Sequence, residues 1–211
     1  MHQTQPTESS APQLGKPGAG LPKMEAFFSR YVIMRLGPRL FSIPRAHKWF
    51  DEANTDILKI VKSAETPELL TTPVLIPKIP GLEDSSRYWS VMMVLSHLIT
   101  VSEGIERIIV ALSQGVRPHQ IVRIEDVKPP ENLSGNLTDP AQVKQTIEEF
   151  EKMSTTLVPR LNRLVKDWNS LTTLPHPWFG EMTARQWNFL LGIHQRLHLR
   201  QIELIMKEVS P

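Results

Sequence analysis

The sequence predicts an all-α protein, a four-helix bundle with an extra helix on its N-terminal side. Four long segments repeat apolar residues at intervals of three and four, the spacing of a helix with one buried face. Residues that favour helix ends flank these segments. The chain has 211 residues, of which 40% are hydrophobic and 22% charged, so it is large enough for one domain with a sizeable core.

The N-terminal part divides into a tail and a helix. Residues 1–22 are rich in Gly, Ser, Thr and Gln and contain four prolines, so we expect a disordered tail. Residues 23–43 are expected to form an N-terminal extension whose helix spans 24–36 and ends at Gly37-Pro38. The bundle is expected over residues 44–211. The extension helix could lie on a membrane, pack on a second subunit or cover its own core, and the last is favoured.

The first two bundle helices are predicted over residues 45–64 and 87–113. The first carries a single apolar stripe after Pro44, a residue type that suits a helix N-terminus. The second ends before Gly115, which is suited to cap a helix C-terminus. Within the second helix, Gly104 would allow another backbone to approach closely.

A long connection separates the second helix from the third. Residues 115–138, about 24 in all, are too many for a hairpin between antiparallel neighbours. A connection of this length can return along the bundle, which would make the second and third helices parallel. The third helix is expected to begin at Asp139-Pro140, an N-cap followed by proline. The fourth is expected to begin at Thr183, which forms a capping-box pattern with Gln186.

Three histidines on these helices carry the functional hypothesis. His194 and His198 are four residues apart and share one face of the fourth helix. His97 lies on the apolar seam of the second helix, at a similar depth if the two helices are antiparallel. Three imidazoles from two helices, with no cysteine or fourth histidine nearby, would form the open kind of site that is typical of catalytic metals. Core histidines bonded to the backbone, or a water-filled cavity, are the alternatives.

Other polar residues near the seam are candidates for supporting roles. Gln201 lies one turn after His198 and is expected to orient a metal ligand through a hydrogen bond. Glu103 and Glu106 could supply a fourth ligand or a hydrogen-bond partner. Helical geometry turns Glu103 away from His97, so a solvated position is favoured for it.

His176 stands apart from the helical histidines. It lies between two prolines in the segment 174–180, which is expected to be a loop outside regular structure before the fourth helix. At the open end of the bundle it could contact a substrate or relay protons, and we assign it the candidate catalytic role. The alternative is a plain loop residue whose neighbours Trp178 and Phe179 cover the core.

Composition argues against several other functions. The chain has no cysteine, so it can form no disulfide, thiol nucleophile or thiolate ligand. Its net charge is +2 and its basic residues form no stripe with interleaved aromatics, so no nucleic-acid partner is expected.

No apolar run reaches the roughly 20 residues that span a bilayer, and a signal-peptide pattern is missing, so we expect no transmembrane segment and a cytoplasmic location. Residues 1–49 hold seven Lys and Arg against two Glu, so a charge-based partner would meet this part.

Two groups of residues resemble the motifs of a known family. Trp89-Ser90 followed by Leu95-Ser96-His97-Leu98 resembles the second-helix motif of the DinB-like (YfiT-like) superfamily. A second group resembles the end of the branch with an HPxFG loop before the last helix: His176-Pro177-Trp178-Phe179-Gly180, Thr183, Trp187, Ile193-His194 and His198-Leu199-Arg200-Gln201. The likeness leaves out the tail and the extension helix.

The resemblance implies an up-down-down-up topology and a divalent metal, commonly zinc or nickel, on His97, His194 and His198. It also implies a homodimer and a small-molecule substrate. Characterised members include S-transferases that use low-molecular-weight thiols and hydrolase-like metal enzymes, so we expect a divalent-metal-dependent enzyme, with thiol-dependent S-transfer ahead of hydrolysis. A non-catalytic stress protein that binds a metal or a small ligand is the alternative. A structural bundle with inert histidines is a third.

Overall fold

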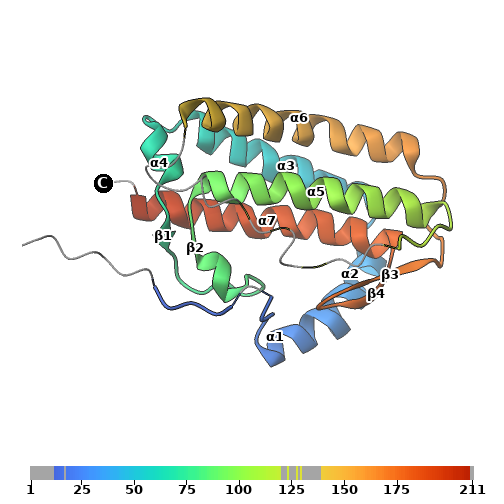
Figure 1. Cartoon of the computed structure of the whole chain (residues 1–211). Coiled ribbons are helices and arrows are strands. Elements are labelled where there is room, and N and C mark those ends of the chain that lie inside the picture. The colour runs from blue at the N-terminus through green and yellow to red at the C-terminus, as the bar shows by residue number, and fades with distance from the viewer. Residues whose placement is uncertain are drawn as a thin grey trace, which may run out of the picture.

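The structure is a computed structural model that describes residues 12–16, 18–119, 123, 127, 129 and 139–209. The described part is mainly helical, as predicted, and Figure 1 shows four long helices lying alongside one another. Two pairs of short antiparallel strands, which the all-α prediction did not include, precede two of these helices. None of the helices in the described ranges combines the length and the apolar character needed to cross a bilayer.

The four long helices are α3 (Ile43–Lys62), α5 (Val91–Ser113), α6 (Pro140–Leu164) and α7 (Ala184–Val209). Helix α7 packs along both α3 and α5, and α5 also packs along α6. Three of the helices begin where a side chain caps a free backbone N–H, and the capping residues are Ser42, Ser90 and Asp139. The start of the third predicted helix at Asp139-Pro140 is therefore confirmed.

Helix α5 begins at Val91, later than the predicted residue 87. The residues before it form a 3₁₀ turn, η2 (Asp84–Arg87), and a short strand, β2 (Tyr88–Trp89). Strand β2 pairs antiparallel with β1 (Val74–Leu75), which follows the short helix α4 (Pro67–Thr71). The end of α5 is as predicted, because Gly115 follows it with a φ of 75°.

The segment before α7 is a hairpin and not the predicted loop. Strand β3 (Thr173–His176) pairs antiparallel with β4 (Gly180–Thr183), so His176 ends a strand. The prolines beside His176 favoured a loop, but proline, which lacks an N–H donor and has a fixed φ, is tolerated on an edge strand. Both strands of a two-stranded sheet are edges. Gly180 begins β4 with a φ of 74°, a backbone conformation that favours glycine.

The N-terminal extension is helical over a longer stretch than predicted. It consists of α1 (Lys23–Phe28), a π-helical turn η1 (Ser29–Ile33) and α2 (Met34–Leu40). The predicted stop at Gly37-Pro38 is wrong, because both residues lie inside α2. Pro38 has no N–H to offer the Met34 carbonyl, but Gln186 Nε2 donates to that oxygen at 2.9 Å. A side-chain contact from α7 thus replaces the missing helical bond.

Glycines show where elements approach most closely. A Cβ atom at Gly192 of α7 would lie 2.6 Å from the Ala46 carbonyl oxygen in α3, so this interface requires glycine. The sequence predicted such an approach at Gly104 of α5, and the described residues show none. Among them, a Cβ atom at Gly104 would meet the Arg107 side chain, at 4.0 Å, and Gly104 borders a cavity.

The described part of the predicted tail contacts the body of the protein. The Gly15 N–H donates to the Asp84 carboxylate at 2.8 Å, and the Gly20 N–H donates to Glu83 at 3.0 Å. The side chain of Leu21 is buried. The prediction of disorder for residues 1–11, and most of the predicted 115–138 connection, lie outside the described residues.

Candidate metal centre

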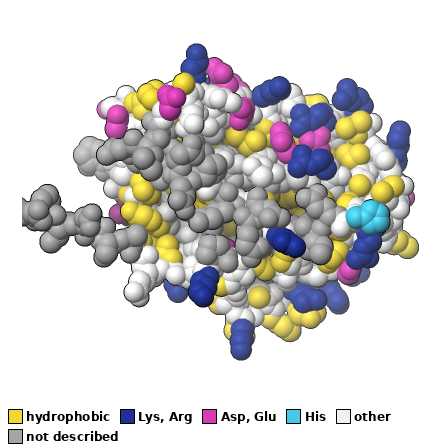
Figure 2. All heavy atoms as spheres, in the orientation of Figure 1, with side chains coloured by type: hydrophobic (Ala, Val, Ile, Leu, Met, Phe, Trp, Pro, Cys, Tyr) yellow, Lys and Arg dark blue, Asp and Glu magenta, His cyan; other side chains and the backbone are white. Residues whose placement is uncertain are grey.

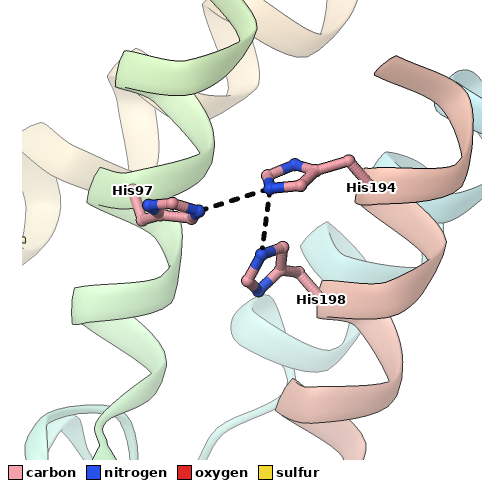
Figure 3. A group of neighbouring side chains, drawn as sticks. All are labelled: His97, His194 and His198. Carbon is pink, nitrogen blue, oxygen red and sulfur yellow. Dashed lines mark hydrogen bonds between the residues drawn. The ribbon is translucent and has the colours of Figure 1, made fainter. Parts of the chain in front are cut away.

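Helices α5 and α7 bring three histidine side chains to one point. His97 comes from α5, and His194 and His198 come from consecutive turns of α7, as Figure 3 shows. Nε2 of His194 lies 3.3 Å from Nε2 of His97 and 3.2 Å from Nε2 of His198. The candidate ligand atoms of the three rings all lie within 4.8 Å of one another, so this group of described residues could hold a metal ion.

Two of the rings are held from their outer sides. Nδ1 of His97 lies 2.8 Å from the carbonyl oxygen of Val127, and Nδ1 of His198 lies 2.6 Å from Oε1 of Gln201. These oxygens can only accept, so each Nδ1 carries the proton and donates it. Gln201 is fixed in turn, because its Nε2 donates to the Ser86 carbonyl at 2.7 Å. In the neutral rings, the Nε2 atoms of His97 and His198 therefore present lone pairs to the centre.

The inner nitrogens fit a shared cation. Because His97 and His198 both direct lone pairs inward, a proton on Nε2 of His194 could satisfy only one of them. Two nitrogens bound tetrahedrally to one zinc ion, each at about 2.0–2.1 Å, lie about 3.3 Å apart. Two of the three separations, at 3.2 and 3.3 Å, agree with that value, and the remaining pair, His97 and His198, lies within 4.8 Å. Burying unpaired polar atoms costs free energy, and a cation would satisfy all three at once.

Burial keeps the three imidazoles uncharged. Removal from water lowers the pKa of His97 to about 4 and the pKa of His198 to about 3. The pKa of His194 falls well below its usual value, mainly through burial and further through the other histidines. Metals bind the neutral form of imidazole, so the rings need not release protons to bind one at neutral pH.

His176 lies at the same cavity without joining the cluster. Its ring stacks on Phe179, with the ring centroids 4.5 Å apart, and lies 5.4 Å from the ring of Trp187. Its Nδ1 accepts a hydrogen bond from the Trp178 N–H at 3.1 Å, so the neutral ring carries its proton on Nε2. Burial lowers the pKa of His176 to about 3. The ring is therefore a neutral hydrogen-bond donor, and its catalytic role stays a prediction.

The two glutamates weighed as a fourth ligand lie elsewhere. Glu106 forms a two-pronged ion pair with Arg160 of α6, with both N–O distances at 2.7 Å, so its oxygens link α5 to α6. Glu103 is exposed, as expected. Neither belongs to the group of described residues that could hold a metal.

The three histidines border a cavity of about 560 Å³, a size typical of small-molecule sites. Much of its lining is apolar, and its aromatic residues are Trp89, Trp178, Phe179 and Trp187. The N-terminal extension supplies part of the wall through Ile33 and Met34. The cavity can therefore enclose an apolar molecule next to the imidazoles.

Several features of this site left no signal in the sequence. The carbonyls that hold His97 and Gln201 belong to Val127 and Ser86, and any residue could supply a backbone carbonyl. The wall built by the extension was also missed, because an apolar helix suits many packing partners. Gln201 lies where its seam position predicted, bonded to His198.

Known proteins share the part of the chain that carries this site. The sequence profile of the DinB superfamily matches residues 49–202, which include all three histidines and exclude the N-terminal extension. The uncharacterized protein YuaE of Bacillus subtilis strain 168 is 26% identical over 154 residues, covering 63% of this chain and 91% of YuaE. No solved structure matches the chain.

Proposed function

The chain belongs to the DinB superfamily, and from this membership and the histidine cluster we propose that it is a divalent-metal-dependent enzyme. His97, His194 and His198 would hold the metal, and zinc or nickel suits an all-imidazole set. The observation that carries the proposal is the convergence of three Nε2 atoms, two of which are fixed as lone-pair donors by hydrogen bonds to Val127 and Gln201.

A divalent ion bound here would lower the pKa of a water molecule or a thiol and so supply a nucleophile near neutral pH. The chain's own residues prepare the ligands for this task. Gln201 accepts the Nδ1 proton of His198, and the Val127 carbonyl accepts that of His97. These bonds hold each ring in the tautomer whose Nε2 is free, and they make that nitrogen more basic.

The cavity supports a small-molecule substrate with an apolar body. Its aromatic walls would exclude water and pack against rings or alkyl groups. We propose that His176 contacts this substrate by donating a hydrogen bond from its Nε2. Because its pKa is lowered to about 3, the ring acts as a neutral donor at pH 7 and brings no positive charge to the substrate.

For the reaction, we propose thiol-dependent S-transfer with a low-molecular-weight thiol, ahead of metal-dependent hydrolysis. The preference for S-transfer over hydrolysis rests on the family resemblance and not on any residue of the site. A protein that binds the metal or a small ligand without catalysis is the second candidate, and the largely apolar cavity beside the cluster suits it equally.

Metal analysis combined with activity assays tests the proposal. Zinc-loaded protein is assayed for thiol transfer to an aromatic electrophile and for ester and amide hydrolysis. We expect about one metal ion per chain, and we expect His198→Ala to lose the metal and more than about 100-fold in activity. His119→Ala, which removes an exposed imidazole, is the matched control and should retain both. Stoichiometric metal without activity would favour the binding protein, and absence of metal binding would contradict the enzyme and the metal-binding form of the second candidate.

We also propose that the four long helices form the up-down-down-up bundle that the resemblance implies. Figure 1 supports this order, because α3 and α7 run one way along the bundle and α5 and α6 run the other way.

We further propose that the protein forms a homodimer, as the family resemblance implies, and light scattering tests this. A monomeric mass at micromolar concentration would contradict it.

A further inference from the structure

The N-terminal extension exposes an apolar stripe that the fold does not use. Met24, Phe27, Phe28 and Tyr31 follow helical spacing along α1 and η1 and are 81, 61, 53 and 43% exposed. A contiguous aromatic stripe at a protein surface marks an interaction site, whereas scattered apolar residues do not. In Figure 1, α1 projects away from the long helices. Figure 2 shows hydrophobic and basic side chains gathered along the same lower edge.

The opposite face of the extension already anchors it to the protein. Met34 is almost fully buried and, with Ile33, lines the cavity. Gln186 donates a hydrogen bond to the Met34 carbonyl, and the Glu25 carboxylate accepts one from the Gly81 N–H at 3.1 Å. The expectation that this helix covers its own core therefore explains the buried face of the extension and leaves the exposed face unexplained. The exposed stripe is available to bind a partner outside the chain.

Basic side chains flank the exposed stripe. The guanidinium groups of Arg30 and Arg35 each lie 5.5 Å from the centre of the Tyr31 ring. Glu25 is the single acidic residue between positions 23 and 41, and its bond to Gly81 turns it inward. Four exposed basic residues accompany the stripe: Lys23, Arg30, Arg35 and Arg39. This face therefore complements a negatively charged, partly apolar surface.

We propose that this face docks on an anionic lipid surface. The stripe of Met24, Phe27, Phe28 and Tyr31 inserts at the boundary between headgroups and acyl chains, and the flanking basic residues meet lipid phosphates. A second copy of this chain fits the face less well. A two-fold contact presses the same patch against itself and would bring like charges together. The proposal uses no residue of the histidine cluster and does not depend on the metal.

Vesicle flotation of the full chain tests the proposal. We expect binding to phosphatidylcholine vesicles that contain about 30% phosphatidylglycerol, no binding to phosphatidylcholine alone, and release at about 0.5 M salt. The double variants Phe27→Ser/Phe28→Ser and Arg35→Glu/Arg39→Glu should each lower binding at least about tenfold. Leu171→Ser and Lys152→Glu are the matched controls, because they change an exposed apolar and an exposed basic residue elsewhere, and both should bind normally.

Three results would overturn the proposal. The first is no binding to anionic vesicles, and the second is binding that the phenylalanine variant leaves unchanged. The third is a protein that ignores vesicles while Phe27→Ser/Phe28→Ser converts a dimer to a monomer, which would identify the face as a contact between copies. Metal-free and metal-loaded protein should bind vesicles equally, so failure of the metal proposal would leave this result intact.

Discussion

Each imidazole of the cluster has an inner and an outer nitrogen, and the outer hydrogen bonds decide what the inner nitrogens can do. Val127 and Gln201 fix the protons of His97 and His198 on the outer side. The outer nitrogen of His194 is buried and has no hydrogen-bond partner among the described residues. Hydrogen bonds therefore orient two of the three candidate ligands, His97 and His198. The ring of His194 is placed by its position on α7 alone, as far as the described residues show.

Replacing Gln201 should weaken metal binding without removing a ligand. In Gln201→Leu, Nδ1 of His198 and the Ser86 carbonyl both lose their partner, so the ring is no longer held in one tautomer. We expect the metal dissociation constant to rise about 10- to 100-fold, measured by competition with a chelating dye. Gln195→Leu is the matched control, because that buried glutamine on the same helix donates to Ser102 instead. An equal loss in both variants would contradict the orienting role.

His47 should make stability depend on pH. Burial lowers its pKa below the ordinary value of 6.5, while Asn188 partly opposes this through a hydrogen bond. Below pH 6.5 the unfolded chain binds a proton that the folded protein does not, so the free energy of unfolding falls as pH falls. In His47→Gln, denaturant melts of metal-free protein should show a slope smaller by up to about 1.4 kcal/mol per pH unit. An unchanged slope would show that His47 titrates alike in both states.

At the scale of elements, α7 is the common partner. It packs on α3 through a backbone contact at Gly192 and on α5 beside the histidines. Its first turn also holds the extension, because Gln186 donates to Met34 and Arg185 donates to the Pro38 carbonyl at 2.7 Å. The position of α7 therefore sets both the cluster and the cavity wall.

Alanine substitutions at two helical glycines should distinguish the effect of close packing on the free energy of unfolding from the effect of helix propensity. Gly192→Ala forces a Cβ atom against the Ala46 carbonyl and should lower the free energy of unfolding by about 1–3 kcal/mol. Gly104→Ala places its Cβ atom no nearer than 4.0 Å to any described side chain or backbone, apart from its chain neighbours and its own helix backbone, and should be neutral or stabilising by up to about 1 kcal/mol. Urea denaturation measures both variants, and equal effects would contradict the assigned contact.

The sequence predicted long helices well because their apolar spacing and caps are local. Asp139 caps α6 and Gly115 follows α5, as their residue types indicated. The β3–β4 hairpin was missed because Pro175 and Pro177 carry the local signal of a loop. The pairing of β3 with β4 overrides this local preference. It depends on both strands together, so the sequence of neither strand alone predicts it.

The cluster itself could be inferred only in part from the sequence. The four-residue spacing of His194 and His198 places them on one helix face whatever the fold. Bringing His97 to them also required the direction of a second helix, and the seam positions predicted a similar depth only on the assumption that the two helices are antiparallel. The carbonyls of Val127 and Ser86, and the cavity wall of the extension, depend on long-range contacts and could not be predicted.

At the scale of the whole molecule, metal binding should couple to folding. The ligands come from two helices, and the carbonyls that hold His97 and Gln201 come from two further connections, so the unfolded chain lacks the site. Zinc at about 100 times its dissociation constant should stabilise the protein by about 2.7 kcal/mol and raise the melting temperature by about 5–10 °C. Calorimetry measures this shift.

The variants distinguish this coupling from a general salt effect. His194→Ala and His198→Ala should lose the zinc-dependent rise in melting temperature, whereas His119→Ala should keep it. A rise that survives in all three variants would indicate zinc binding elsewhere on the chain.

Anomalous X-ray scattering from zinc-loaded crystals grown without chelator tests the central claim most directly. The account predicts one strong peak at the zinc edge, about 2.0–2.1 Å from Nε2 of each of His97, His194 and His198. No peak among these nitrogens, or a peak bound only by other residues, would contradict it.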